Sequence, residues 1–136
     1  MRANIFFVAQ KIEAQDPGLI ITGPITTTRC SQFPSAATLS VMFSLEFDSS
    51  ECGIHHSLQI QTRSPDNQVG WNAKLTSQPV PPHPYDGCGE LTWINPVKFQ
   101  FPSEGVFYIE LLVDNQIVAT VKHYVVLASR PLPDNL

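Results

Sequence analysis

The sequence predicts an all-β fold, a mainly antiparallel two-sheet sandwich of seven or eight strands. Residues 105–127 contain two runs rich in branched and aromatic side chains, and Asp114 and Asn115 between them tolerate the left-handed backbone of a tight hairpin turn. Residues 37–48 alternate between apolar and mostly polar positions, which is the period of a half-buried strand. No segment has convincing helical periodicity. These three observations favour two packed sheets, and closure into a small barrel is the alternative.

The strand at 37–48 gives the clearest alternation. Its predicted inward face is apolar, and its predicted outward face is mostly polar. The inward positions are Leu39, Val41, Phe43, Leu45 and Phe47, and the outward positions are Ser40, Met42, Ser44 and Glu46.

The remaining strands follow from short β-rich runs bounded by turn residues. The turn at 64–68, Ser-Pro-Asp-Asn-Gln, predicts a second hairpin. Residues 77–89 contain four prolines and are predicted to form a long irregular loop, because proline lacks the amide donor of a central strand. One sandwich domain at 1–127 and a flexible C-terminal tail at 128–136 are expected. The other predicted strands are 3–12, 18–28, 54–63, 68–76, 91–101, 105–113 and 117–127.

Composition narrows the function classes. A chain of 136 residues with 43% hydrophobic and 15% charged residues is long enough for one well-packed core. The net charge is -4, and the eight basic residues are scattered, so nucleic acid is not expected as a partner. No apolar run reaches the roughly 20 residues of a membrane span, and no membrane association is expected. Three cysteines without a disulfide framework favour a reducing compartment, and we expect a cytoplasmic protein without a cofactor.

Five short segments resemble a family of small bacterial proteins of unknown function with an immunoglobulin-like or C2-like sandwich. The resemblance covers about 3–127. It implies a sandwich fold and a bacterial or phage origin, and it carries no catalytic residues. Family members often have Tyr at Phe107 and Gly at Asn67 and Asn115, and Asn preserves those turns because it tolerates positive φ. The segments are Gly18-Leu19-Ile20-Ile21-Thr22-Gly23, Phe33-Pro34, Pro65-Asp66-Asn67, Gly105-Val106-Phe107 and Val113-Asp114-Asn115.

Cysteine and histidine residues suggest a zinc site as one alternative. Cys52 and His55 have a spacing suited to one half of a tetrahedral site, and His83 and Cys88 would supply the other half. The second pair is looser than a C-x-x-C motif, so buried or edge cysteines beside exposed histidines are favoured over zinc. A Cys–His nucleophile is disfavoured as well, because no motif or third orienting group accompanies Cys30, Cys52 or Cys88.

Glu46 and Asp48 are the closest carboxylates on one strand face, a pair that acid/base chemistry or calcium binding could use. Strand-end acids are more often solvated, and no calcium-loop motif is present. The sequence therefore predicts no enzymatic site.

Aromatic residues offer the better binding site. Trp71, Trp93, Tyr85 and His83 could form a platform for a sugar or a Pro-rich peptide. Because Trp71 and Trp93 lie within predicted strands, they are expected to fill the core, which leaves His83 and Tyr85 on the 77–89 loop as the predicted binding residues. We expect a non-enzymatic protein-binding or assembly module whose partner is another protein or a second copy, bound through a sheet edge or this loop. A zinc- or small-ligand-binding protein centred on Cys52, His55, His83 and Cys88 is the alternative.

Overall fold

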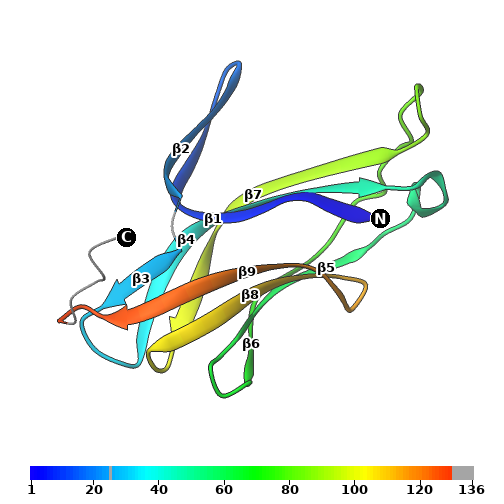
Figure 1. Ribbon diagram of the computed structural model, residues 1–136. Helices are drawn as coiled ribbons and strands as arrows, with labels where there is room; N and C mark the ends of the chain where they lie inside the picture. The colour runs from blue at the N-terminus through cyan, green and yellow to red at the C-terminus, as the bar shows by residue number, and fades with distance from the viewer. Residues whose placement is uncertain (25, 130–136) are drawn as a thin grey trace.

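The computed structural model describes residues 1–24 and 26–129 and contains two β-sheets that pack over a shared core (Figure 1). Within these ranges the chain has nine strands and one short 3-10 helix, η1 (Ser49–Glu51). The strands are β1 (Arg2–Gln15), β2 (Gly18–Pro24), β3 (Thr27–Cys30), β4 (Ser35–Phe47), β5 (Ser57–Arg63), β6 (Val69–Thr76), β7 (Gly89–Phe101), β8 (Gly105–Val113) and β9 (Gln116–Leu127).

Sheet A has the strand order β2-β1-β4-β7, and sheet B has the order β3-β9-β8-β5-β6. Every neighbouring pair is antiparallel except β3 and β9, which run parallel. The predicted all-β, mainly antiparallel, two-sheet architecture is therefore confirmed, but the described residues contain nine strands instead of the predicted seven or eight.

Both predicted hairpins are present. Asp114 (φ 49°) and Asn115 (φ 68°) connect β8 to β9, and Asn67 (φ 69°) lies in the turn between β5 and β6. All three have the left-handed backbone that short polar side chains tolerate at turns. Local turn chemistry was sufficient to predict these two connections.

The segment 18–28 is not one strand, as the sequence predicted, but two strands in different sheets. Gly23, the last residue but one of β2, has a φ of 59°, which departs from the extended backbone of a regular strand and which glycine adopts without strain. β2 ends at Pro24 beside β1 in sheet A, and β3 begins at Thr27 beside β9 in sheet B. The chain therefore crosses between the sheets within the predicted strand.

β1 is longer than predicted because it changes partner at Ala9. Its first half pairs with β4, and its second half pairs with β2. Residues 10–23 form a two-stranded ribbon, here called the arm, that projects from the sandwich (Figure 1). One face of the arm is aliphatic, with Ile12 opposite Ile21 and Ala14 opposite Leu19. Leu19 and Ile21 are exposed, so this face has little cover.

The other strand boundaries differ from the prediction by no more than three residues. β5 begins at Ser57 instead of residue 54, and β7 begins at Gly89, so the loop between β6 and β7 covers 77–88. In the predicted tail, the Ala128 amide donates a hydrogen bond to the Cys30 carbonyl (2.7 Å), and residues 130–136 lie outside the described residues.

Aromatic side chains dominate the core between the sheets. Phe101 contacts Phe99 (centroid distance 6.4 Å), the edge of Phe107 (5.2 Å) and the ring of His123 (6.0 Å). All four side chains are almost completely buried. Such contacts add to the stabilisation from burial itself.

The inward face of β4 was predicted correctly, but its outward face is more buried than expected. Ser40, Met42 and Ser44 are only 8–9% exposed. Because β4 is a central strand, its outward side chains have neighbours on both sides, and Met42 lies between Phe7 of β1 and Ile94 of β7.

The two tryptophans differ. Trp93 packs against the core and stacks on Phe43 (5.2 Å), as expected, but the prediction for Trp71 is wrong, because its side chain is 62% exposed. A register shift at Ile60 and Gln61 pairs Trp71 with Gln61, on the outward face of sheet B. An irregularity of this kind reverses the facing of later side chains and is not visible in the alternation of one strand.

Candidate functional site

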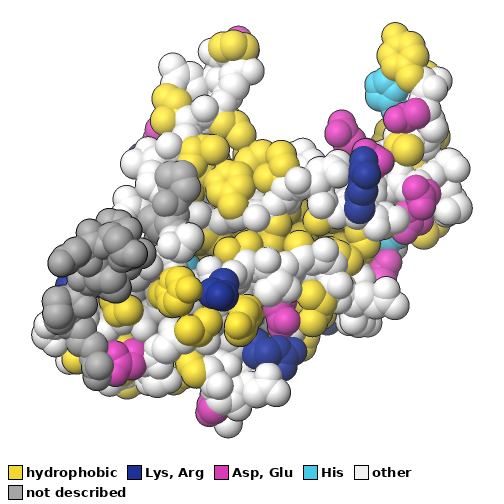
Figure 2. All heavy atoms as spheres, in the orientation of Figure 1, with side chains coloured by type: hydrophobic (Ala, Val, Ile, Leu, Met, Phe, Trp, Pro, Cys, Tyr) yellow, Lys and Arg dark blue, Asp and Glu magenta, His cyan; other side chains and the backbone are white. Residues whose placement is uncertain are grey.

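The 77–88 loop projects beyond the sandwich at the opposite end of sheet A from the arm (Figures 1 and 2). Tyr85 near its tip is 93% exposed, the highest exposed fraction among the large hydrophobic side chains of the described residues. Tyr85 lies beside His83, with a ring-centroid distance of 5.0 Å and an interplanar angle of 34°. The two predicted binding residues therefore form one aromatic surface.

Short-range hydrogen bonds hold the loop tip in shape. The His83 amide donates to the Cys88 carbonyl (2.7 Å), and the Gly87 amide donates to the His83 carbonyl (2.8 Å). The Cys88 amide donates to Asp86 Oδ1 (2.9 Å), and the Tyr85 amide donates to His83 Nδ1 (3.2 Å). Because the prolines also restrict the backbone, little conformational entropy remains to be lost on binding.

The base of the loop is anchored to the segment that follows η1. The Gly53 amide donates to the Val80 carbonyl (3.0 Å). Gly89, the first residue of β7, packs so closely that a Cβ there would lie 2.8 Å from Val80 Cγ1 and 2.9 Å from Cys52 Sγ. Only glycine fits this position without a shift of its neighbours.

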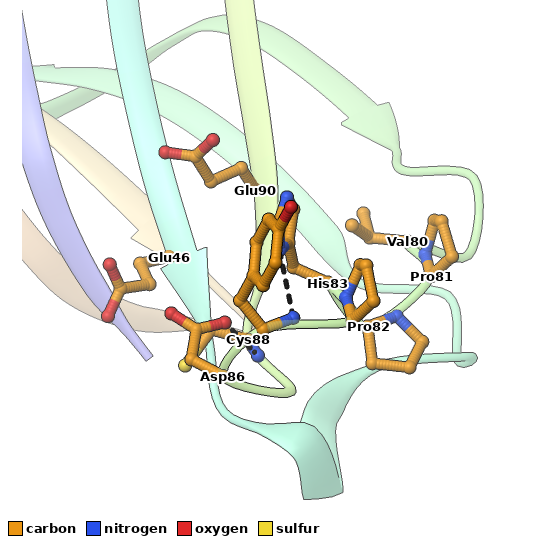
Figure 3. A pocket seen from close by; sticks show the side chains of 10 residues that line it. Glu46, Val80, Pro81, Pro82, His83, Asp86, Cys88 and Glu90 are labelled. Atoms are coloured by element: carbon orange, nitrogen blue, oxygen red, sulfur yellow. Dashed lines mark hydrogen bonds between the residues drawn. The ribbon is translucent and has the colours of Figure 1, made fainter.

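A cleft of about 560 Å³ lies between the loop and the adjoining ends of β4 and β7 (Figure 3). Its wall on the loop side combines prolines with the His83 and Tyr85 rings, and its other polar groups are the carboxylates of Glu46, Asp86 and Glu90. No lysine or arginine of the described residues lines it. The lining residues are Glu46, Val80, Pro81, Pro82, His83, Pro84, Tyr85, Asp86, Cys88 and Glu90.

Two of these carboxylates are direct cross-strand neighbours. Glu46 of β4 pairs in register with Glu90 of β7, and like charges in such positions are unfavourable. On its other side Glu46 pairs with Arg2, whose Nη2 lies 3.5 Å from Glu46 Oε1, and the Arg2 side chain is 71% exposed. Burial raises the pKa of the Cys88 thiol, and Asp86 and Glu46 raise that pKa further. The Cys88 thiol is therefore neutral at physiological pH.

The predicted zinc ligands are not brought together as a ligand set. Within residues 1–24 and 26–129, no three His, Cys, Asp or Glu side chains lie together so that they could hold a metal ion. His55 Nδ1 donates to the Ser77 carbonyl (2.9 Å), and the Cys52 thiol donates to the Asp48 carbonyl (3.4 Å). His83 Nδ1 accepts the Tyr85 amide. Cys52, His55 and His83 each have a structural hydrogen-bond partner instead.

Glu46 and Asp48 line one shallow pocket together with Met1 and Arg2. Each carboxylate has a cationic neighbour there, because Arg2 Nη2 lies 3.5 Å from Glu46 Oε1 and the Met1 amino group lies 3.6 Å from Asp48 Oδ2. The sequence favoured a solvated pair of acids over an acid/base or calcium site, and among the described residues neither carboxylate belongs to a group of three possible metal ligands.

Sequence reasoning missed His56, which lies one residue from a predicted ligand. His56 is 4% exposed and stacks on Phe47 (4.6 Å). Its Nδ1 donates to Asp114 Oδ2 (2.7 Å), and its Nε2 donates to the Glu51 carbonyl (2.8 Å). Since 58 residues separate His56 from Asp114, no local motif could reveal this pair.

Both partners of this pair have shifted pKa values. Burial alone would lower the pKa of His56, but the hydrogen bonds to Asp114 and to the Glu51 carbonyl outweigh it and raise that pKa above its ordinary value. The hydrogen bond from His56 lowers the pKa of Asp114, and the hydrogen bond from the Ser57 amide lowers it further. The pair ties the β8–β9 turn to the segment before β5.

Sequence reasoning also missed His123, whose pKa is shifted in the opposite direction from that of His56. Its ring is completely buried and hydrogen-bonds Thr28 Oγ1 through Nε2 (2.7 Å), and its Nδ1 has no partner in the described structure. Burial lowers the pKa of His123 to about 4. His123 is therefore a neutral core residue that joins β9 to β3.

These observations define a two-sheet, all-β domain with a preorganised acidic and aromatic cleft at one end. Residues 4–126 match the family described as Family of unknown function (DUF6941), and the chain belongs to that family. The match covers nearly the whole of the resemblance predicted over 3–127. No curated protein matches the sequence. No helix in the described ranges has the length and apolar character needed to cross a membrane.

Proposed function

We propose that this chain is a non-enzymatic protein-binding module of a bacterial or phage cytoplasmic system, built on an immunoglobulin-like or C2-like sandwich. A segment of the partner protein occupies the cleft beside His83 and Tyr85. The observation that carries the proposal is the 93% exposure of Tyr85 on a loop held by its own hydrogen bonds. A large exposed ring on a stiff projection is typical of an interface anchor, since it provides contact area at low entropy cost.

The surroundings of the thiols support a non-enzymatic role. Cys30 is buried in the core. The Cys52 thiol donates to backbone carbonyls, and the pKa of Cys88 is raised instead of lowered. A nucleophilic cysteine needs the reverse, an accessible thiolate beside a base.

The experiment that tests this function is quantitative co-purification from the native host. His83→Ala combined with Tyr85→Ala should remove a stoichiometric partner that the unmodified protein retains. Tyr124→Ala, which truncates an exposed tyrosine (42%) on sheet B, is the matched control and should retain it. Equal partner recovery with the loop variant would rule out the loop as the docking site.

The arm favours a second candidate, assembly of identical chains through a sheet edge. β2 is an edge strand of sheet A, and the aliphatic face formed by Ile12, Ala14, Leu19 and Ile21 has little cover in the described structure. An isolated two-stranded ribbon is only marginally stable in water, so contact with a second copy would stabilise it. Leu19→Glu should then reduce the sedimentation coefficient at high concentration, whereas Thr22→Glu, on the opposite arm face, should not.

A further inference from the structure

The chemistry of the partner segment can be derived from the outward face of sheet A, where three cross-strand rows lead away from the cleft. The row at the cleft is Arg2, Glu46 and Glu90. The next row consists of Ile5, Ser44 and Thr92, and the third of Phe7, Met42 and Ile94. The surface therefore changes from acidic to apolar along the direction of the strands.

The acidic end requires a positive charge. Glu46 and Glu90 repel one another across the strands, and Asp86 adds a third carboxylate from the loop. Arg2 lies close to Glu46 but forms no ion pair with Glu90, and Glu90 has no ion pair among the described residues. The adjacent Tyr85 ring presents a face that attracts a cation. A lysine or arginine side chain between the carboxylates and this ring satisfies both features.

The position of the apolar row defines the spacing between the charged and the apolar side chain of the bound segment. Glu46 and Met42 lie four positions apart along β4, and Glu90 and Ile94 lie four positions apart along β7. At a rise of about 3.3 Å per residue, the two ends lie about 13 Å apart. Figure 2 shows apolar side chains gathered on the surface between the arm and the loop, with no loop over them. An extended segment lying along the strands would place side chains four positions apart at the two ends.

We propose that the occupant is an extended segment of a partner protein with a lysine or arginine at the cleft and a large apolar residue four positions away, lying on the outward face of sheet A. This inference rests on the proposed function, and it assigns the recognition to charge complementarity at Glu46, Asp86 and Glu90 and to apolar contact at Phe7 and Ile94, which are half-buried on either side of the buried Met42. A nucleic acid lacks the positive charge that this end of the surface selects.

The test uses a synthetic probe and amide NMR spectra of the isotope-labelled full chain. The probe is an acetylated Gly/Ser peptide with one Arg and, four positions later, one Leu. Control peptides replace Arg by Gln or move Leu two positions closer. The Arg probe should shift the amide signals of the cleft and the third row. It should bind about fivefold more tightly than the Gln control, a factor typical of one exposed ion pair or cation–π contact. It should also bind more tightly than the control with the displaced Leu, which loses its apolar contact with the third row.

Protein variants locate the binding. Glu90→Gln should weaken the probe about fivefold, and Glu13→Gln, which removes the same charge from a strand of the arm, should leave it unchanged. Tyr85→Ala should also weaken it. Equal binding of the Arg and Gln peptides, or Arg binding that is unaffected by Glu90→Gln, would overturn the inference.

A different result would contradict the proposed function itself. If the loop variant loses the natural partner but the probe shows no preference for Arg, the loop is the docking site and only the partner chemistry is wrong. If the loop variant keeps the natural partner, both are wrong. Melting temperatures of the Tyr85 and Glu13 variants should agree with that of the unmodified protein, because these side chains are exposed. That of Glu90→Gln should be equal or higher, because the substitution relieves the repulsion from Glu46.

Discussion

Asp114→Asn should remove a pH-dependent part of the stability without disturbing the fold. Asn tolerates the φ of 49° at this turn, and its carbonyl oxygen can still accept the Ser57 amide that Asp114 Oδ1 accepts at 2.9 Å. The substitution removes the charge that faces His56 Nδ1 at 2.7 Å. The variant therefore keeps the turn and the Ser57 hydrogen bond but removes both the charge and the acceptor that face His56 Nδ1.

The sign follows from the two pKa shifts. The pKa of His56 is raised above 6.5, so its contribution is fully present below pH 6.5 and disappears as the pH rises through the folded value. The pKa of Asp114 is lowered below 3.8, so the carboxylate is ionised throughout this range. Stability gained from the pair should thus be greatest between about pH 4 and pH 6.5 and should decline at alkaline pH.

The expected magnitude is about 1 kcal/mol, the difference between a hydrogen bond to a charged group and a neutral one. A larger value is not expected, because the Asp114 side chain is 56% exposed and solvent screens it. Urea unfolding gives the difference in unfolding free energy between the wild type and Asp114→Asn. That difference should be about 1 kcal/mol larger at about pH 5.5 than at about pH 8.5. His123 titrates identically in both proteins, so it cancels from this comparison.

The matched control is Asp66→Asn, which removes the same charge from the other hairpin turn, where no histidine lies opposite. Its stability difference from the wild type should not change between the two pH values. If Asp114→Asn behaves like this control, the charged interaction between His56 and Asp114 does not contribute to stability, and the reasoning is refuted.

Three further substitutions test the core and the loop base. His123→Phe should remove the acid sensitivity that His123 causes, because the unfolded state binds a proton below pH 6.5 and the folded state only near pH 4. In urea titrations at successive pH values the wild type should lose up to about 3 kcal/mol of unfolding free energy over this range, and an equal dependence of that free energy on pH in both proteins would contradict the assignment. Phe101→Ala, which removes a fully buried ring with three aromatic neighbours, should lower the free energy of unfolding by about 3–5 kcal/mol, and a loss below about 1 kcal/mol would show that the site collapses around the vacancy. Gly89→Ala should lower it by about 1–3 kcal/mol, because the new Cβ meets Val80 and Cys52, and an unchanged thermal midpoint would show that the loop base adapts freely.

The parts of the fold that the sequence predicted correctly depend on local signals. Turn residues at Asp114, Asn115 and Asn67 marked both hairpins, and strict alternation marked the inward face of β4. The division of 18–28 between two sheets was missed because strand propensity is high on both sides of Gly23. Propensity describes a pleated surface but does not specify which sheet a strand joins.

Only part of the candidate site was predicted, for the same reason. His83 and Tyr85 are visible in the sequence because the prolines around them mark an exposed loop. Glu46 and Glu90 were not recognised as neighbours, because their contact depends on the register between β4 and β7. Trp71 was assigned to the wrong face because a register shift intervenes. Cross-strand relations of this kind depend on tertiary pairing and have no local signature.

The construction of the loop makes recognition separable from stability. Two of the hydrogen bonds that shape its tip join backbone groups of His83, Gly87 and Cys88, and two others use the side chains of His83 and Asp86, but none of them requires the Tyr85 ring. The base, by contrast, depends on the close packing of Gly89 against Val80 and Cys52. Truncation of the Tyr85 ring should therefore alter binding while the fold persists, whereas changes at the base should alter both. A loss of binding by Tyr85→Ala at an unchanged melting temperature is thus direct evidence about contact with the partner.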